Sequence, residues 1–71
     1  MELKEIKYNL KKRVLHTNKR LYLKDVPYIL NRVILDKDEK GNFFYVAEIR
    51  DVNAPYSVSE VSLDSIREVD T

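Results

Sequence analysis

The chain has 71 residues, no cysteine, one histidine and a net charge of +1. This length favours a single domain over residues 1–71, and the composition excludes disulfides and the usual Cys and His zinc sites. No apolar run approaches the ~20 residues of a membrane span, and residues 1–15 lack the apolar core of a signal peptide. We therefore expect a cytoplasmic protein with no membrane partner, no metal and no other cofactor.

Charge is distributed unevenly along the chain. Residues 1–37 hold ten Lys and Arg against four Asp and Glu, a net +6, whereas residues 38–71 hold three against eight, a net −5. Two interpretations are open. Either the two halves attract each other, within one fold or between stacked copies, or the basic half binds an anionic partner.

The first sixteen residues fit two patterns. One helical face would carry the apolar residues spaced by three and four, namely Leu3, Ile6, Leu10 and Val14. Ile6, Tyr8 and Leu10 also alternate as they would in a strand, and no capping residue or glycine marks a helix end. Residues 1–10 are therefore a peripheral helix or an extended arm, and the sequence leaves the choice open.

Two short strands are predicted next, over residues 13–16 and 21–23. Thr17-Asn18-Lys19 reads as the loop between them. Lys24-Asp25 is a candidate tight turn into the following segment, because Asp tolerates unusual backbone angles.

Residues 26–52 predict a long β-hairpin around which the rest of the chain packs. Its turn, Asp38-Glu39-Lys40-Gly41, suits a type I turn followed by a glycine at positive φ. The implied register pairs Asp36 with Phe44, Leu35 with Tyr45, Ile34 with Val46, Val33 with Ala47, Arg32 with Glu48, Asn31 with Ile49 and Leu30 with Arg50.

This register separates two faces, because side chains alternate along a strand. The predicted core face carries Ile29, Asn31, Val33, Leu35, Phe43, Tyr45, Ala47 and Ile49. The outer face mixes charged residues with Tyr28, Leu30, Ile34, Phe44 and Val46, and it places Arg32 opposite Glu48. An outer face this apolar needs a cover, which is either residues 1–10 or another molecule.

The last third of the chain completes a β domain. Residues 52–55 predict a turn, residues 56–63 a strand, residues 63–66 a single helical turn and residues 67–69 a short last strand. The fold class is therefore mainly β: an SH3-like small barrel or a strongly bent antiparallel sheet built on the 26–52 hairpin.

Three segments carry the resemblance to an SH3-like barrel. They are an entry strand with Tyr8, Leu10, Arg13 and Val14, the central strands over residues 43–52 and 56–61, and the closing segment over residues 62–69. Where such barrels often have Gly-Asp, this chain has Lys11 and Lys12, which departs from the expected tight turn. In size and Lys-rich composition the sequence also resembles short orphan proteins of phages and prophages of Gram-positive bacteria.

The residues needed for catalysis do not form a recognisable pattern. The chain has no cysteine, so a Cys–His pair is excluded, and His16, the only histidine, is the one possible base of a Ser–His–Asp triad. We expect His16 near the surface at a strand end. Asp36-x-Asp38-x-Lys40-Gly41 begins like an EF-hand loop but places Lys at a ligand position. A single glycine cannot build a phosphate-binding loop. We expect no enzymatic activity.

Two surfaces are candidates for binding. For a protein partner or a second copy of the chain, the outer face of the hairpin supplies Tyr28, Leu30, Arg32, Ile34, Phe44, Val46 and Arg50. The alternative is a nucleic-acid surface in the basic half, made of Lys7, Tyr8, Lys11, Lys12, Arg13, Lys19, Arg20 and Tyr22. The leading expectation is a small non-enzymatic protein-interaction module, as a phage or prophage accessory protein would be.

Overall fold

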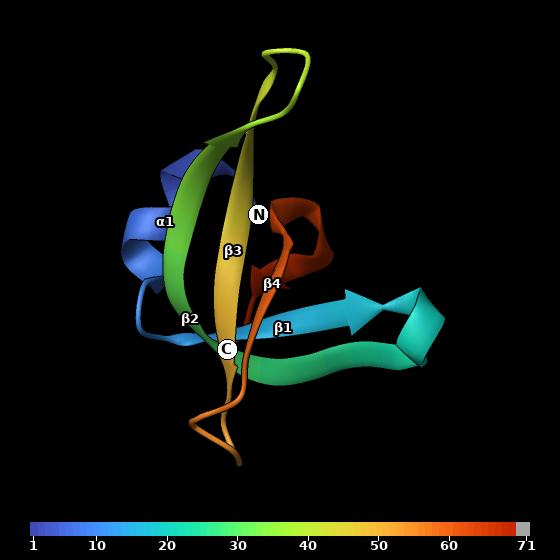
Figure 1. Cartoon of the computed structure of the whole chain (residues 1–71). Helices are drawn as coiled ribbons and strands as arrows, with labels where there is room; N and C mark the ends of the chain where they lie inside the picture. The colour runs from blue at the N-terminus through green and yellow to red at the C-terminus, as the bar shows by residue number, and fades with distance from the viewer. Residues whose placement is uncertain (70–71) are drawn as a thin grey trace.

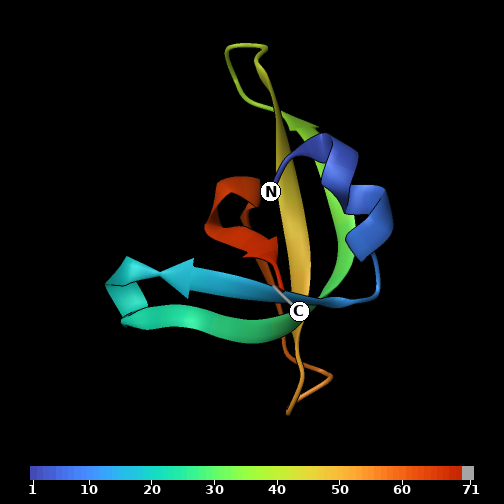
Figure 2. The same ribbon diagram turned by 180° about the vertical axis from the view of Figure 1, so that it is seen from behind.

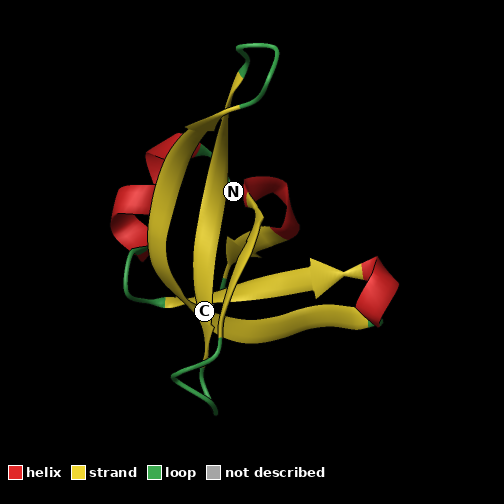
Figure 3. Ribbon diagram, viewed as in Figure 1, coloured by secondary structure: helices red, strands yellow, loops and turns green. Residues whose placement is uncertain are grey.

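The computed structural model of the chain describes residues 1–69, and these are mainly β (Figures 1 and 3). The elements in chain order are α1 (Leu3–Asn9), β1 (Arg13–Asn18), the 3₁₀ helix η1 (Lys19–Leu21), β2 (Leu23–Lys37), β3 (Phe43–Asp51), β4 (Val58–Ser62), the 3₁₀ helix η2 (Leu63–Ser65) and β5 (Ile66–Glu68). The single helical turn predicted over residues 63–66 is confirmed as η2, and the Ser62 hydroxyl accepts the Asp64 N–H at its start.

All five strands form one antiparallel sheet in the order β4-β3-β2-β1-β5. The long strand β2 pairs with β1 through its first half and with β3 through its second half, so the sheet bends along β2 (Figure 1). Its edge strands, β4 and β5, hold five and three residues and lie at opposite ends of the strand order. Of the two predicted forms, the bent sheet is right, and the sheet is not closed into a barrel.

The undecided N-terminal segment is a short helix. The Glu2 N–H donates to Glu5 Oε1 over 3.0 Å at the start of α1. Lys11 ends the helical region with a φ of 68°, in the left-handed region that glycine enters more easily. The Lys11 N–H then donates to the Leu30 carbonyl over 2.7 Å, which fixes the chain beside β2. A lysine therefore makes the turn for which the SH3-like pattern would supply glycine.

The predicted hairpin is confirmed at its turn and in its far half. The Gly41 N–H donates to the Asp38 carbonyl over 3.0 Å, and Gly41 has a φ of 88°. The Asp38 carboxylate accepts the Lys40 and Asn42 N–H groups, each over 2.9 Å, and the Asn42 hydrogen bond leads in lowering the pKa of Asp38. The register from Asp36 opposite Phe44 to Arg32 opposite Glu48 is the predicted one.

Closer to the body of the protein the predicted register is wrong by one residue. The pairing shifts between Leu30 and Arg32, so Leu30 lies opposite Ile49 rather than opposite Arg50. Asn31 is the extra residue of a β-bulge, which reverses the faces of the residues before it. Leu30 and Tyr28 consequently leave the predicted outer face and point to the core, and Ile29 leaves the core face.

The core lies on the inner face of the sheet. Its buried members come from every strand except β4 and from η2: Val14, Leu30, Ala47, Ile49, Leu63 and Ile66. Met1 and Ile6 pack against this cluster, so α1 covers the inner face (Figure 2). The idea that residues 1–10 cover the outer face is therefore wrong.

The single histidine is also part of this inner layer. His16 is 4% exposed and its ring meets the Tyr28 ring edge-on, with centroids 5.6 Å apart. Its Nδ1 lies 3.3 Å from the Ser65 carbonyl oxygen. The expectation of a histidine near the surface is wrong, because β5 pairs beside His16 and η2 packs over it.

Candidate functional site

The outer face is the side of the sheet opposite to the core, and we use the name for residues in register on β1 to β5. Two of its cross-strand rows are Arg13–Ile29–Arg50–Val58 and Ile34–Val46–Ser62, with Phe44 beyond the second. Both α1 and η2 lie on the inner side (Figures 1 and 2). Within residues 1–69 this face therefore has no covering layer, and Phe44 and Val58 are 41% and 53% exposed.

Most residues predicted for partner binding do share this face. The five that do so are Arg32, Ile34, Phe44, Val46 and Arg50. Tyr28 and Leu30 do not, since the bulge at Asn31 turns both toward the core. The sequence prediction missed Arg13, Ile29 and Val58, which continue the face across β1 and β4. Only the bulge position would have revealed them, and no residue pattern marks it.

Arginine is concentrated on the outer face. Four of the five arginines of the chain lie there, namely Arg13, Arg32, Arg50 and Arg67. Arg67 Nε lies 3.1 Å from Asp25 Oδ1, and this contact leads in lowering the pKa of Asp25. Arginine is enriched at protein interfaces, because its planar guanidinium makes several directed hydrogen bonds while its stem packs.

Two of these arginines are available for a partner. Arg13 and Arg50 lie on either side of Ile29 in one cross-strand row. Neither has an ion pair among residues 1–69. They place two cations without an ion pair on either side of Ile29, which fits a partner that carries an acidic group beside apolar side chains.

A buried carboxylate fixes the centre of the face. Glu48 is 9% exposed, accepts a hydrogen bond from the Asn31 amide, and lies 3.1 Å from Arg32 Nε. The Asn31 hydrogen bond is the leading cause that lowers the pKa of Glu48, and Arg32 adds to it. Lys11 Nζ donates to Asn31 Oδ1 over 2.8 Å. The predicted Arg32–Glu48 pair is thus part of a network that ties the bulge to the end of α1.

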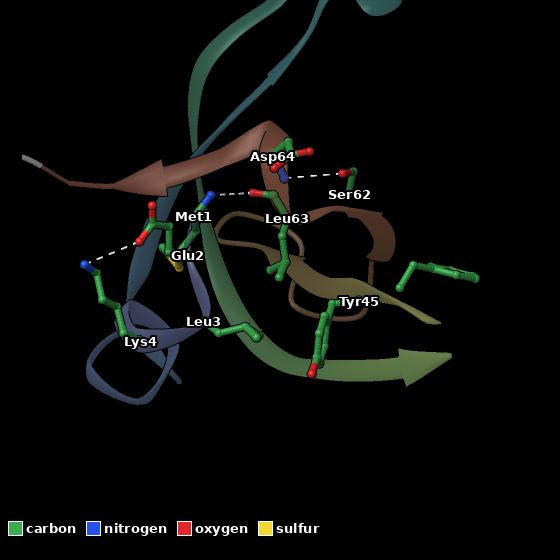
Figure 4. A pocket seen from close by; sticks show the side chains of 9 residues that line it. Met1, Glu2, Leu3, Lys4, Tyr45, Ser62, Leu63 and Asp64 are labelled. Atoms are coloured by element: carbon green, nitrogen blue, oxygen red, sulfur yellow. Dashed lines mark hydrogen bonds and ion pairs between the residues drawn. The ribbon is translucent and has the colours of Figure 1, made fainter. Parts of the chain in front are cut away.

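A shallow depression lies between the first residues of the chain and η2, and its lining includes Phe44 from the outer face (Figure 4). Leu3, Tyr45 and Leu63 form part of its wall, and the Met1 amino group donates to the Leu63 carbonyl over 2.7 Å. Of its polar groups, the Ser62 hydroxyl is engaged by the Asp64 N–H. The depression is therefore a largely apolar surface hollow, and His16 is not among the residues that line it.

Over residues 1–69, no three His, Asp or Glu side chains converge in a way that could hold a metal ion. In that part of the chain, no helix has the length and apolar character needed to cross a bilayer.

The basic residues proposed for nucleic-acid binding do not form one surface. Lys7, Tyr8, Lys11 and Lys12 lie before β1, next to Arg13 at its start, whereas Lys19, Arg20 and Tyr22 lie beyond its end. A six-residue strand separates the two groups by about 17 Å. In the first group, Lys7 Nζ lies 5.1 Å from the Tyr8 ring centroid and Lys11 binds Asn31. The two groups must be judged separately.

Comparisons with models of protein families, with curated proteins and with solved structures found no match to this chain. No residue role can therefore be transferred from a relative.

Proposed function

We propose that this chain is a small, non-enzymatic protein-interaction module that binds a protein partner through its outer face. The observation that carries the proposal is an uncovered sheet face that combines apolar side chains with four arginines. The solvated face of an antiparallel sheet normally carries polar side chains. Here it carries Ile29, Ile34, Phe44 and Val46 as well.

The composition of the face suits binding energetics. Aromatic and arginine side chains tend to dominate the binding energy of protein interfaces, and Phe44 lies diagonally opposite Ile34 on the face that also carries Arg32. The Glu48 network holds Arg32 in place before any partner arrives, which lowers the entropy cost of ordering it. A second copy of the chain is one candidate partner, as the sequence analysis anticipated.

The proposal also includes an SH3-like origin, a phage or prophage role and a location in the cytoplasm. A descent from SH3-like barrels is supported by the long central hairpin, the 3₁₀ helix before the last strand and the pairing of β5 with β1. A phage or prophage accessory role is supported by size and composition. The absence of cysteine agrees with a reducing cytoplasm.

The proposal is tested by reversing the character of one exposed outer-face residue. Phe44→Lys should keep the fold, since Phe44 is 41% exposed, and should abolish capture of a partner that the wild-type chain retains from host extract. Leu35→Lys is the matched control, because Leu35 lies on the inner face of the same two strands and is 55% exposed.

Comparing the two variants shows whether Phe44 binds a partner or is needed for the fold. Loss of capture with Phe44→Lys and normal capture with Leu35→Lys supports the proposal, provided that both keep the wild-type circular dichroism spectrum. Equal capture by both variants contradicts it. Unfolding of Phe44→Lys would also contradict it, because Phe44 would then be part of a packed layer. Light scattering of the wild type over a range of concentrations identifies self-association.

A further inference from the structure

The tip of the β1–β2 hairpin projects from the rest of the molecule (Figures 1 and 2). It consists of η1 and the first residues of β2, and its sequence is KRLYLK, residues 19–24. Leu21 is 65% exposed and Tyr22 is 95% exposed. An apolar pair at a projecting tip contributes nothing to the core, so the fold does not account for it.

Backbone hydrogen bonds define the turn that carries these two residues. The Asn18 side-chain oxygen accepts the Arg20 and Leu21 N–H groups, over 3.0 and 3.4 Å, and so caps η1. Tyr22 ends the turn with a φ of 56°, in the left-handed region. The predicted strand over residues 21–23 therefore starts only at Leu23. An exposed tyrosine is an unfavourable residue at positive φ, since glycine or asparagine would fit better.

Positive charge surrounds the apolar pair. Lys19, Arg20 and Lys24 have no ion pair among residues 1–69. The nearest acidic residue in the sequence, Asp25, is engaged by Arg67 Nε over 3.1 Å and by the Thr17 hydroxyl over 3.4 Å. Lys19, Arg20 and Lys24 thus lie beside Leu21 and Tyr22 without an ion pair among residues 1–69.

We propose that this tip is a peripheral membrane-contact site that binds the surface of an anionic lipid bilayer. Leu21 and Tyr22 would enter the boundary between headgroups and acyl chains, where tyrosine is enriched. The three cations would lie at the level of the anionic headgroups, and each is expected to strengthen binding about fivefold. Because the hairpin projects, a flat surface can reach the tip without touching the outer face (Figure 1).

The exposed side chain of Leu21 favours a lipid bilayer over a nucleic acid as the ligand of the tip. A single strand of nucleic acid could stack a base on Tyr22 and bind the cations through its phosphates, but it would make little favourable contact with an aliphatic side chain. An anionic bilayer interacts favourably with both apolar residues and with the cations. The inference is independent of the outer face, and it replaces the expectation that the protein has no membrane partner.

Sedimentation with lipid vesicles tests the inference directly. The full chain should sediment with phosphatidylcholine vesicles that contain phosphatidylserine, weakly and reversibly, and much less with phosphatidylcholine alone. Added salt should release it, because headgroup attraction is screened. Replacing Leu21 with Ser should weaken binding about tenfold, since a leucine side chain loses its apolar contact.

Tyr22→Gly separates a binding role from a structural one. Glycine accepts positive φ without strain, so this variant should unfold at a higher urea concentration than the wild type and yet bind vesicles less. Tyr56→Ala is the matched control, because Tyr56 is fully exposed in a loop, residues 52–57, that has no lysine or arginine. It should bind as the wild type does.

Three results would overturn the inference. One is failure of the wild-type chain to sediment with anionic vesicles at low salt. Another is a Tyr56→Ala variant that loses as much binding as Tyr22→Gly. The third is a chain that retains a single-stranded DNA oligonucleotide through Tyr22 and ignores vesicles, which would make the tip a nucleic-acid site.

Discussion

The two faces of the β2–β3 hairpin differ in what covers them. On the inner face, Leu30, Ala47 and Ile49 are almost fully buried beneath residues from outside the hairpin, such as Leu63, which follows Ile49 by 14 positions. On the outer face, Ile34 and Val46 pair directly across the strands and receive no layer from residues 1–69. Alternation in a strand therefore assigns a residue to a face, but only distant segments decide whether that face is buried.

The first way to test this difference is to remove one side chain from each face. Leu30→Ala should lower the free energy of unfolding by about 2–5 kcal/mol, a large share of the roughly 4–10 kcal/mol expected for this length. Ile34→Ala should cost about 1 kcal/mol, since its side chain remains in contact with water. Urea unfolding measures both, and equal losses would contradict the assignment of the two faces.

A smaller effect is expected from the carboxylate at the centre of the outer face. The pKa of Glu48 is lowered from its ordinary value of 4.5, so its contribution to stability is present above that pH and lost as the pH falls further. Glu48→Gln should therefore be less stable than the wild type near neutral pH. The difference should shrink below pH 4.5 in urea unfolding.

Glu60→Gln is the control for this pH dependence, because Glu60 lies opposite Glu48 on β4 and is exposed. It should leave the stability profile between neutral and acid pH close to that of the wild type. A Glu48→Gln deficit that stayed constant through this range would show that the carboxylate charge does not stabilise the fold.

The smallest effect concerns the turn at the end of the hairpin, which lies beyond the core. Gly41→Ala should destabilise the protein by about 1 kcal/mol, because alanine is strained at positive φ. An added Cβ would meet only Lys37 Cε at 3.6 Å, so crowding is not the cause. Thermal unfolding checks the change, and a stability gain would contradict the observed turn.

Much of the fold could be predicted from local chemistry. The Asp38 to Gly41 turn determines the register of the nearby residues, and the short turn before the last strand follows from the sequence near Ser62. Those features depend on residues within a few positions of one another. The sequence also predicted that the two faces of the hairpin differ, although Tyr28, Ile29 and Leu30 were assigned to the wrong faces.

The errors come from interactions that no local pattern encodes. The bulge at Asn31 is stabilised by Glu48 and by Lys11, which lie 17 and 20 positions away. Glycine was the expected residue for left-handed turns, yet Lys11 and Tyr22 adopt that conformation. The helix at residues 3–9 packs on the inner face because Met1 and Ile6 contact the core cluster. Alternation alone could not show any of this.

The account depends most on the outer face being open in the isolated chain. Since the chain has no cysteine, single cysteines report exposure cleanly, and Val46→Cys and Ala47→Cys place a thiol on opposite faces at adjacent positions. We expect Cys at position 46 to react with a small alkylating reagent far faster than Cys at position 47, which should react only through unfolding. Equal, slow reaction at both positions in dilute protein would show a covered outer face and contradict the account.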